Sequence, residues 1–196
     1  MAAARPIRNK KHVQCLLNYF KNLGETLLNL RNNALMALGV YTALRIGDIL
    51  SLRWEDVYDF KNGRPRESIA LTEQKTGKPK VIAVHAELAA ALKMYWEYAK
   101  PSPDSPVIVN PNTGKALSRF QAHRIIKGAG EAVGIPYPIS CHSLRKTFGY
   151  HACKKGTPLP VIMDIYNHTS YEVTRRYLGI TQDEKDAVYV NINFNN

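Results

Sequence analysis

Six side chains in this sequence are of the kinds that bind and cut a phosphodiester bond. In chain order they are Arg45, Lys75, His142, Arg145, His168 and Tyr177. Arginine presents a planar fork of donors that matches a phosphate through two hydrogen bonds. A tyrosine hydroxyl can attack phosphorus and hold it covalently, as other side-chain nucleophiles do. If the fold gathers all six, they could carry out phosphoryl transfer, although no one of them is diagnostic alone.

His142 and Arg145 are three residues apart, so on a helix both project from one face. They lie near the expected N-terminus of that helix, where free N–H groups and the helix dipole favour an anion. The pair therefore predicts a phosphate pocket. A lone pair of this kind is more often a surface arginine beside a satisfied histidine, so it needs support from the other residues.

The remaining candidates have ordinary interpretations when each is taken alone. Arg45 has Asp48 one turn away, which can hold the guanidinium in place, but such a pair taken alone is more often a surface salt bridge. Lys75 stands in a predicted turn, where most lysines are simply solvated. His168 falls between two predicted helices. Tyr177 is one of eleven tyrosines, and position alone does not single it out.

The charge of the chain favours a polyanionic partner. Twenty-seven Lys and Arg against sixteen Asp and Glu give a formal net charge of +11. Basic patches gain affinity for nucleic acid by releasing counterions from the phosphate backbone. The alternative is a basic protein that its charge keeps soluble. No apolar run approaches the ~20 residues that a membrane span needs, so a membrane partner is not expected.

The three cysteines do not form a disulfide or zinc pattern. Cys15, Cys141 and Cys153 are odd in number and lack C-x-x-C spacing, which favours a reduced, cytoplasmic setting. Cys141 and Cys153, with His142 and His151, superficially suggest zinc. Their spacing fits no usual zinc module, so no metal is predicted.

The spacing of apolar residues predicts a mainly helical α+β fold in which helices carry most of the candidate residues. The expected helices cover 12–21, 27–44 (capped by Asn29 or Asn32), a segment through Ile49, Leu50 and Leu52, 87–100, 118–133 (capped by Ser118), 140–156 (opened by Ser140 or Cys141), 158–166 and 171–177.

Short β-prone segments separate these helices in the middle of the chain. Val57–Tyr58, Ser68–Thr72 and Lys80–Val84 are divided by turn signals at Asn62–Gly63 and Thr76–Pro79. They predict one small three-stranded antiparallel sheet, with Lys75 near its second turn.

Taken together, the motifs resemble those of the tyrosine recombinase (phage integrase) family, over nearly the whole chain. Tyr41–Leu52 resembles the first arginine box of the family, Lys75–Lys78 its β-hairpin lysine, and His142–Phe148 its His-x-x-Arg box. Tyr166–Ser170 stands where the family usually has Leu-Gly-His-Ser-Ser, and Tyr177 falls at the position of the nucleophile. The shared order and spacing make the resemblance strong, although each box alone is weak to moderate.

Three residues depart from the family pattern. Asn167 replaces the usual glycine and Tyr166 the usual leucine, so the loop that holds His168 is expected to differ in shape. Asp48 stands where glutamate is commoner. None of the three removes a catalytic group.

The resemblance implies a mechanism. Tyr177 would form a 3′-phosphotyrosyl intermediate with release of a 5′-hydroxyl. His142 would act as general base and Lys75 as the acid that protonates the leaving oxygen. The remaining residues would stabilise the phosphate or support the pocket: Arg45, Arg145, His168 and, behind them, Asp48. No cofactor is implied, and strand cleavage is expected to persist in chelator.

The resemblance also implies a partner and a domain plan. The partner is double-stranded DNA, bound by a homo-dimer or homo-tetramer, with a possible DNA-bending accessory protein. The integration, excision or inversion of a bacterial mobile element is the expected outcome. Possible DNA contacts are Arg119, His123, Arg124, Lys127, Arg175 and Arg176.

Residues 1–196 are expected to form a single catalytic domain without a separate N-terminal DNA-binding domain, because only about thirty residues precede the helix leading to Arg45. A natural short recombinase and a trimmed longer one both fit. A tail from about 187 has alternating apolar residues at Val188, Val190, Ile192 and Phe194. This tail can add a strand to a neighbouring subunit or fold back on its own chain.

Three other functions remain open from the sequence. A type IB topoisomerase shares the nucleophile chemistry but reseals the same strand. A DNA-binding regulator can keep the fold without catalysis, although it has no need for all six residues. A basic helical adaptor would carry the motifs by coincidence.

Overall fold

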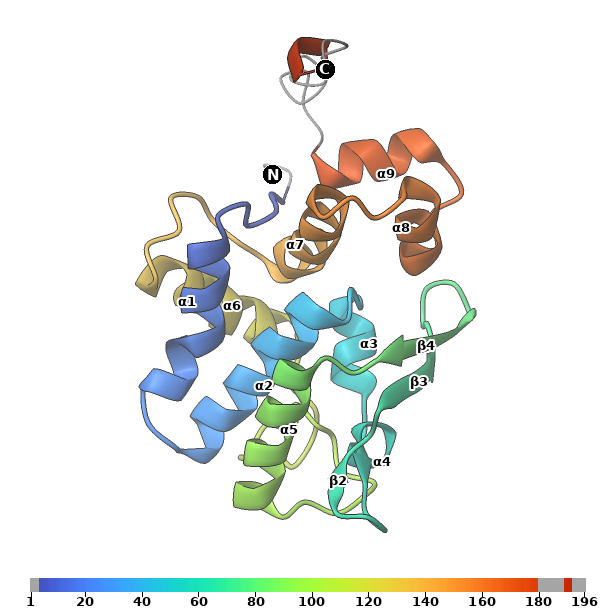
Figure 1. Cartoon of the computed structure of the whole chain (residues 1–196). Helices are drawn as coiled ribbons and strands as arrows, with labels where there is room; N and C mark the ends of the chain where they lie inside the picture. Colours follow the sequence, from blue (N-terminus) through green and yellow to red (C-terminus); the bar gives the residue numbers. More distant parts are fainter. Residues whose placement is uncertain (1–3, 180–188, 192–196) are drawn as a thin grey trace.

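The computed structural model describes residues 4–179 and 189–191, which are mainly helical with short antiparallel strands (Figure 1). The helices are α1 Lys10–Asn22, α2 Leu27–Tyr41, α3 Ile46–Ser51, α4 Trp54–Val57, α5 Ala86–Ala99, α6 Arg119–Ala132, α7 Cys141–Lys154, α8 Leu159–Tyr166 and α9 Tyr171–Leu178. The strands are β1 Tyr58–Asp59, β2 Arg64–Pro65, β3 Ser68–Thr72 and β4 Pro79–Ala83.

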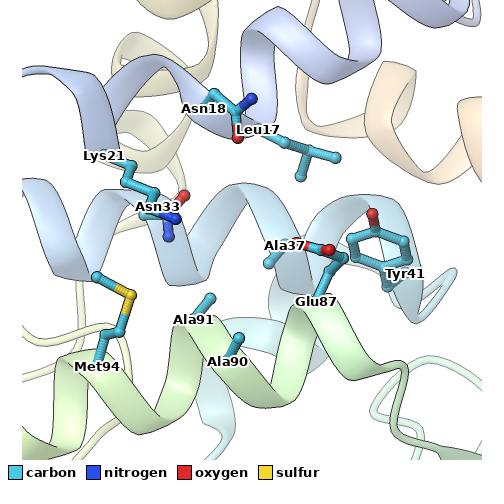
Figure 2. A pocket seen from close by; sticks show the side chains of 10 residues that line it. All are labelled: Leu17, Asn18, Lys21, Asn33, Ala37, Tyr41, Glu87, Ala90, Ala91 and Met94. Atoms are coloured by element: carbon cyan, nitrogen blue, oxygen red, sulfur yellow. The ribbon is translucent and has the colours of Figure 1, made fainter.

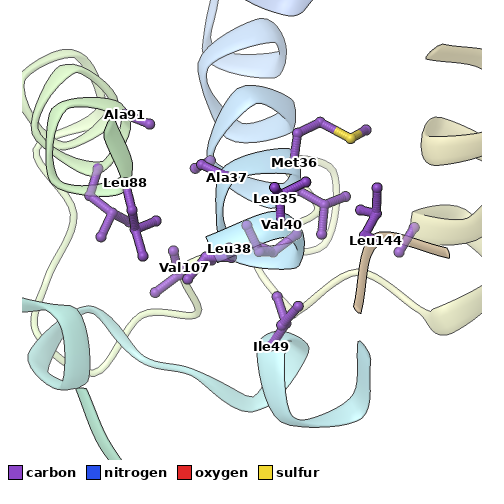
Figure 3. Packing of buried hydrophobic residues seen from close by; sticks show 14 of the residues in the cluster. Leu35, Met36, Ala37, Leu38, Val40, Ile49, Leu88, Ala91, Val107 and Leu144 are labelled. Atoms are coloured by element: carbon purple, nitrogen blue, oxygen red, sulfur yellow. The ribbon is translucent and has the colours of Figure 1, made fainter. Parts of the chain in front are cut away.

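Helix α2 is the centre of the core. Every residue from Leu30 to Val40 is buried, because α1, α5 and α7 pack around it. A helix that is buried on all sides in this way belongs to the interior of a domain. Figure 3 shows Leu35, Met36 and Leu38 among side chains from neighbouring elements, including Leu144 of α7. The core thus holds α7 against α2.

The ends of α2 differ from the prediction. The Thr26 side chain accepts a hydrogen bond from the Asn29 N–H, so Thr26 is the cap and neither Asn29 nor Asn32 is. The helix ends at Tyr41, three residues before Leu44, because Ala43 adopts a left-handed φ of 55°. This break places Arg45 at the N-cap of α3 and not within a continuous helix.

The strands form two separate hairpins, so the prediction of one three-stranded sheet was wrong. Strand β1 pairs with β2, and β3 pairs with β4 over Ser68–Ala83. The Asp59 carboxylate accepts the N–H groups of Lys61 and Asn62. This turn returns the chain at once, so β1 pairs with Arg64–Pro65 and not with β3.

Serine caps define the second half of the domain as the sequence predicts. Ser118 and Gln121 form a reciprocal capping box at the start of α6. Ser140 precedes α7, and its N–H donates to the hydroxyl of Ser143. His142 and Arg145 therefore lie in the first turns of α7.

Helices α7, α8 and α9 approach one another closely around Gly149. A Cβ at this glycine would lie 2.6 Å from a side-chain carbon of Leu178 and would also collide with Tyr166. Figure 1 shows the β3–β4 hairpin directed toward α8. A hydrogen bond of 2.6 Å from the Lys80 ammonium to the Ile165 carbonyl joins the two.

A small cavity lies between α1, α2 and α5, and none of the six candidate residues lines it (Figure 2). Leu17, Asn33 and Met94 are among the side chains that line it. Its volume of about 40 Å³ is enough for a few water molecules only.

Two further observations concern the tail and the membrane. Val190 lies in a helical turn at 189–191 and is 81% exposed, whereas Val188, Ile192 and Phe194 lie outside the described residues. Within the described residues, none of the helices is long and apolar enough to cross a membrane.

Candidate active site

The ring of Tyr177 on α9 is surrounded by candidate residues of the same chain. Its centroid lies 6.0 Å from that of His142, 5.2 Å from His168 and 5.1 Å from Tyr166. The Lys146 ammonium is 4.8 Å from the ring centroid. The hydroxyl is buried and forms no well-aligned hydrogen bond among the described residues, although the Arg145 guanidinium lies close enough to act on it as a donor. A buried hydroxyl that lacks a well-formed hydrogen bond is costly to maintain, which is typical of a functional group that awaits a ligand.

The electrostatic surroundings of Tyr177 act in two directions. Burial raises the pKa of the hydroxyl, whereas the positive charges of Arg145 and Arg45 oppose that rise. The side chain is therefore a neutral phenol at neutral pH. Its anion, when formed, would be stabilised by two guanidinium groups.

Backbone carbonyls hold Arg145 in place. The side chain is 2% exposed, and its guanidinium donates to the carbonyl of Ala43 and, at 3.2 Å, to that of Tyr166. The guanidinium also lies 4.7 Å from the centroid of the Tyr166 ring, a favourable cation–π distance. The left-handed backbone at Ala43 aims its carbonyl at Arg145. Such local strain is common at functional sites.

Arg45 is paired with Glu73, and the expected pairing with Asp48 was wrong. Nη1 of Arg45 lies 2.8 Å from Oε2 of Glu73, a carboxylate that is fully buried. Asp48 is 1% exposed, and its Oδ1 accepts the backbone N–H of Gln74 at 2.9 Å. Asp48 therefore supports the β3–β4 turn through Gln74. The carboxylate that pairs with Arg45 is that of Glu73, which is distant from Arg45 in sequence.

Glu73 is an anion in this setting. Burial alone would raise its pKa, but contacts with Arg45, Asn167 and Thr76 outweigh the burial and lower the pKa to about 2. Glu73 is not among the site residues predicted from the sequence. Its neighbours in sequence are polar turn residues, and nothing in that pattern indicates a buried carboxylate.

Both histidines pack edge-to-face against the Tyr177 ring. His142 is exposed, and partial desolvation together with the charges of Arg145 and Lys146 lowers its pKa. His168 is half-buried, with Nδ1 3.0 Å from the Thr174 hydroxyl. Burial and the charge of Arg145 lower the pKa of His168 as well.

Lysines of the β3–β4 hairpin occupy two different environments. Lys75 lies on the exposed turn, close enough for its charge to lower the pKa of His142. Lys80, which the sequence analysis passed over, is 11% exposed and lies 3.7 Å from Glu73. Burial lowers the pKa of Lys80, and the charge of Arg145 lowers it further.

The structure thus gathers four of the other five predicted residues around Tyr177 and leaves Lys75 on a solvated turn nearby. It adds Tyr166, Glu73 and Lys80. Tyr166 was visible only as a departure from the family pattern. It is in fact a fully buried platform beneath Arg145.

The possible DNA contacts on α6 form an accessible basic face. Arg119, Arg124 and Lys127 are exposed, and His123 is half-buried. Arg119 passes over Gly47, where a Cβ would lie 2.8 Å from its Nη2, so this face adjoins the first arginine box. Arg175 on α9 is half-buried, and the Arg176 side chain lies outside the described part of the chain.

Sequence comparisons place this arrangement in a known group of proteins. Residues 9–184 match the model of the phage integrase family. The chain is 34% identical over 190 residues to the probable integrase/recombinase YoeC of Bacillus subtilis, covering 96% of this chain and 97% of that protein. It is 27% identical to the tyrosine recombinase XerD of Listeria monocytogenes over 169 residues, 84% of this chain. There it spans 55% of the relative, about half of its length.

Solved structures agree on the fold. A crystal structure of XerA recombinase has a TM-score of 0.77 at 18% identity, covering 99% of this chain and 66% of that one. XerH recombinase in a post-cleavage complex with its difH substrate has a TM-score of 0.76 at 17% identity, covering 97% and 54%. These matches confirm the predicted α+β recombinase fold and the resemblance drawn from the motifs. The chain belongs to the phage integrase family of tyrosine recombinases.

Proposed function

We propose that this protein is a site-specific DNA recombinase in which Tyr177 cleaves a strand and holds it as a 3′-phosphotyrosyl intermediate. The observation that carries the proposal is the Tyr177 hydroxyl, which is buried without a well-formed hydrogen bond among the described residues and lies beside His142, His168 and Arg145 of its own chain. Family membership supports the same reaction.

The reaction balances without a cofactor. Oη of Tyr177 attacks the scissile phosphorus and loses its proton to His142, while the bond from phosphorus to the 5′-oxygen breaks. Lys75 delivers a proton to that oxygen, which leaves as a hydroxyl. A second 5′-hydroxyl then attacks the phosphotyrosyl bond by the reverse steps. One phosphoester replaces another at each stage, so no external energy source is consumed.

The arginines stabilise the charge on the non-bridging oxygens. Arg145 is fixed by two carbonyls, and Arg45 by Glu73, so both are oriented before DNA arrives. Such preorganised charges account for much of the catalysis in phosphoryl transfer, and one arginine is worth on the order of 10³–10⁵ in rate. His168 donates a hydrogen bond to a phosphate oxygen. Lys75, on an exposed turn, reaches the leaving oxygen only when the hairpin lies over DNA.

The partner is double-stranded DNA, and the working form is a homo-oligomer. The basic face of α6 supports the DNA contact. Lambda integrase, whose structures share this fold, has been crystallised as a dimer on a core site and as a tetramer on a Holliday junction. We propose a dimer or tetramer here as well, with the tail from about 187 contributing to assembly and an accessory DNA-bending protein assisting it.

The test uses nicked suicide duplexes with a randomised central region, followed by sequencing of covalently attached DNA. Wild type is expected to attach DNA, and Tyr177→Phe to bind duplex without attachment. Tyr171→Phe, the same change at an exposed position on α9, is the matched control and should behave as wild type.

Attachment by Tyr177→Phe would mean that another residue is the nucleophile. Binding without attachment by wild type would favour the regulator. Repeated cleavage without exchange between two duplexes would favour a topoisomerase.

A further inference from the structure

One oxygen of Glu73 contacts three segments that carry catalytic residues. Oε2 lies 2.8 Å from Nη1 of Arg45, accepts a hydrogen bond of 2.9 Å from the Thr76 hydroxyl, and accepts another of 2.8 Å from the Asn167 side-chain amide. Thr76 follows Lys75 in the hairpin turn, and Asn167 precedes His168. The first arginine, the lysine turn and the histidine loop therefore meet at a single atom.

The other oxygen of the same carboxylate strengthens this junction. Oε1 lies 3.7 Å from the ammonium of Lys80, which in turn donates to the Ile165 carbonyl of α8 at 2.6 Å. The Glu73 side chain is fully buried, so solvent screens these contacts less than it would at the surface.

Asn167 shows how this chain attaches the histidine loop to the junction. Its φ is 54°, a left-handed conformation that glycine adopts freely and asparagine tolerates. Glycine, the usual family residue here, would satisfy the backbone but would offer no side-chain donor. Asparagine satisfies the same backbone and adds the bond to Glu73.

We propose that Glu73 is a positioning residue for strand cleavage and that Asn167 is its partner: the buried carboxylate fixes Arg45, the Lys75 turn and the His168 loop in one arrangement. This inference rests on cleavage by Tyr177. A competing possibility is that Glu73 is a brake, occupying Arg45 in place of the phosphate. The two ideas predict opposite effects when the carboxylate is neutralised.

The first experiment measures single-turnover attachment to a suicide duplex at several DNA concentrations. It should follow Glu73→Gln, Asn167→Gly and, as matched control, Glu67→Gln. Glu67 pairs with Arg64 at the surface, so Glu67→Gln should match wild type. Misplacement of a catalytic arginine predicts that Glu73→Gln lowers the rate constant about 10- to 100-fold at saturating DNA. Loss of one hydrogen bond predicts a decrease of about 3- to 10-fold for Asn167→Gly.

A positioning role and misfolding affect different quantities in this assay: the rate constant in the first case and the final yield in the second. A positioning role lowers the saturating rate constant but leaves the half-saturating DNA concentration and the final yield of attached protein unchanged. A merely structural role lowers the final yield, because fewer molecules are folded. A faster rate for Glu73→Gln would overturn the proposal and favour the brake. An equal rate, or a loss confined to yield, would overturn the proposal without favouring the brake.

The second experiment exchanges the donor and the acceptor. In Glu73→Gln/Asn167→Asp the glutamine amide can donate to the new carboxylate, so the double variant should be several-fold faster than the product of the two single effects. Asn167→Asp alone places two carboxylates together and should be slower than Asn167→Gly. Strict multiplication of the single effects would show that the two residues do not act together.

Wild-type attachment in the same assay keeps the two proposals distinct. If wild type and the Glu67 control attach DNA while the Glu73 and Asn167 variants do so equally well, only the positioning role fails. If wild type does not attach DNA at all, the proposed cleavage itself fails.

Discussion

Tyr166 contacts both the main chain and the side chain of Arg145. Its hydroxyl donates a 2.6 Å hydrogen bond to the Arg145 carbonyl, and its ring lies 4.7 Å from the guanidinium carbon of the same residue. The ring also lies 5.1 Å from Tyr177. One fully buried side chain thus sets the distance between Arg145 and Tyr177.

We expect Tyr166→Phe to separate these two contacts. It removes the hydroxyl but keeps the ring, so the free energy of unfolding should fall by about 1 kcal/mol with little effect on cleavage. Tyr166→Leu removes the ring that supports Arg145 and should lower the cleavage rate about tenfold or more. Urea unfolding and suicide-substrate attachment measure the two effects. Equal rates for the two variants would contradict a role for the ring.

Gly149→Ala should displace the helices that carry the site, although Gly149 is not itself a site residue. The added methyl group collides with Tyr166 and Leu178, so α8 and α9 must move away from α7. Overpacking of this kind costs about 1–3 kcal/mol. We expect lower stability together with slower attachment by Tyr177.

Gly128→Ala is the matched control for stability. A Cβ at Gly128 of α6 would meet nothing within 4 Å, and alanine favours a helix. Thermal unfolding of the two variants should therefore shift in opposite directions. A stable Gly149→Ala would show that the packing around α7 is looser than described.

The buried Glu73 should make the protein sensitive to acid. Its folded pKa of about 2 lies below the ordinary 4.5. A depressed pKa contributes stability that is present above the unfolded pKa and is lost as pH falls toward the folded one. The contribution is about 3 kcal/mol, lost between about pH 4.5 and about pH 2.

Urea unfolding at about pH 6, 4 and 3 measures this dependence. Glu73→Gln should be less stable than wild type at pH 6 and should show a weaker decline in acid. The exposed control Glu67→Gln should keep the decline of wild type. Parallel curves for wild type and Glu73→Gln would contradict a depressed pKa.

The pH dependence of the cleavage rate should reflect the protonation of His142. A general base acts in its neutral form, and the pKa of His142 is lowered from 6.5 by desolvation and by Arg145. The single-turnover rate should therefore rise with pH to a plateau, and the midpoint of the rise should lie below pH 6.5, lower than for an ordinary histidine. His142→Asn should lower the plateau and remove the rise. A rise that persists in His142→Asn would assign it to another group.

The sequence predicted those parts of the site that depend on local signals. Ser118 and Ser140 mark the starts of α6 and α7 because caps act within a few residues, and His142 and Arg145 share a face because they are three apart. Glu73 was missed because its burial depends on contacts with α8 and the loop before α3. For the same reason the local pairing of Arg45 with Asp48 was the wrong choice. The prediction of a single sheet was also wrong. The Asn62–Gly63 signal indicates a turn, but it does not reveal that the Asp59 carboxylate makes the turn tight enough for β1 to pair with β2.

The two arginines of the proposed active site differ in how easily a mutation can remove the groups that hold them. Arg145 is anchored by the carbonyls of Ala43 and Tyr166, which every amino acid supplies, so no replacement of a side chain deletes an anchor outright. Arg45 is anchored by the carboxylate of Glu73, which a single codon change can remove. Drift or laboratory selection should therefore tune activity more readily through Arg45 than through Arg145, whose two hydrogen-bond acceptors persist as long as the domain folds.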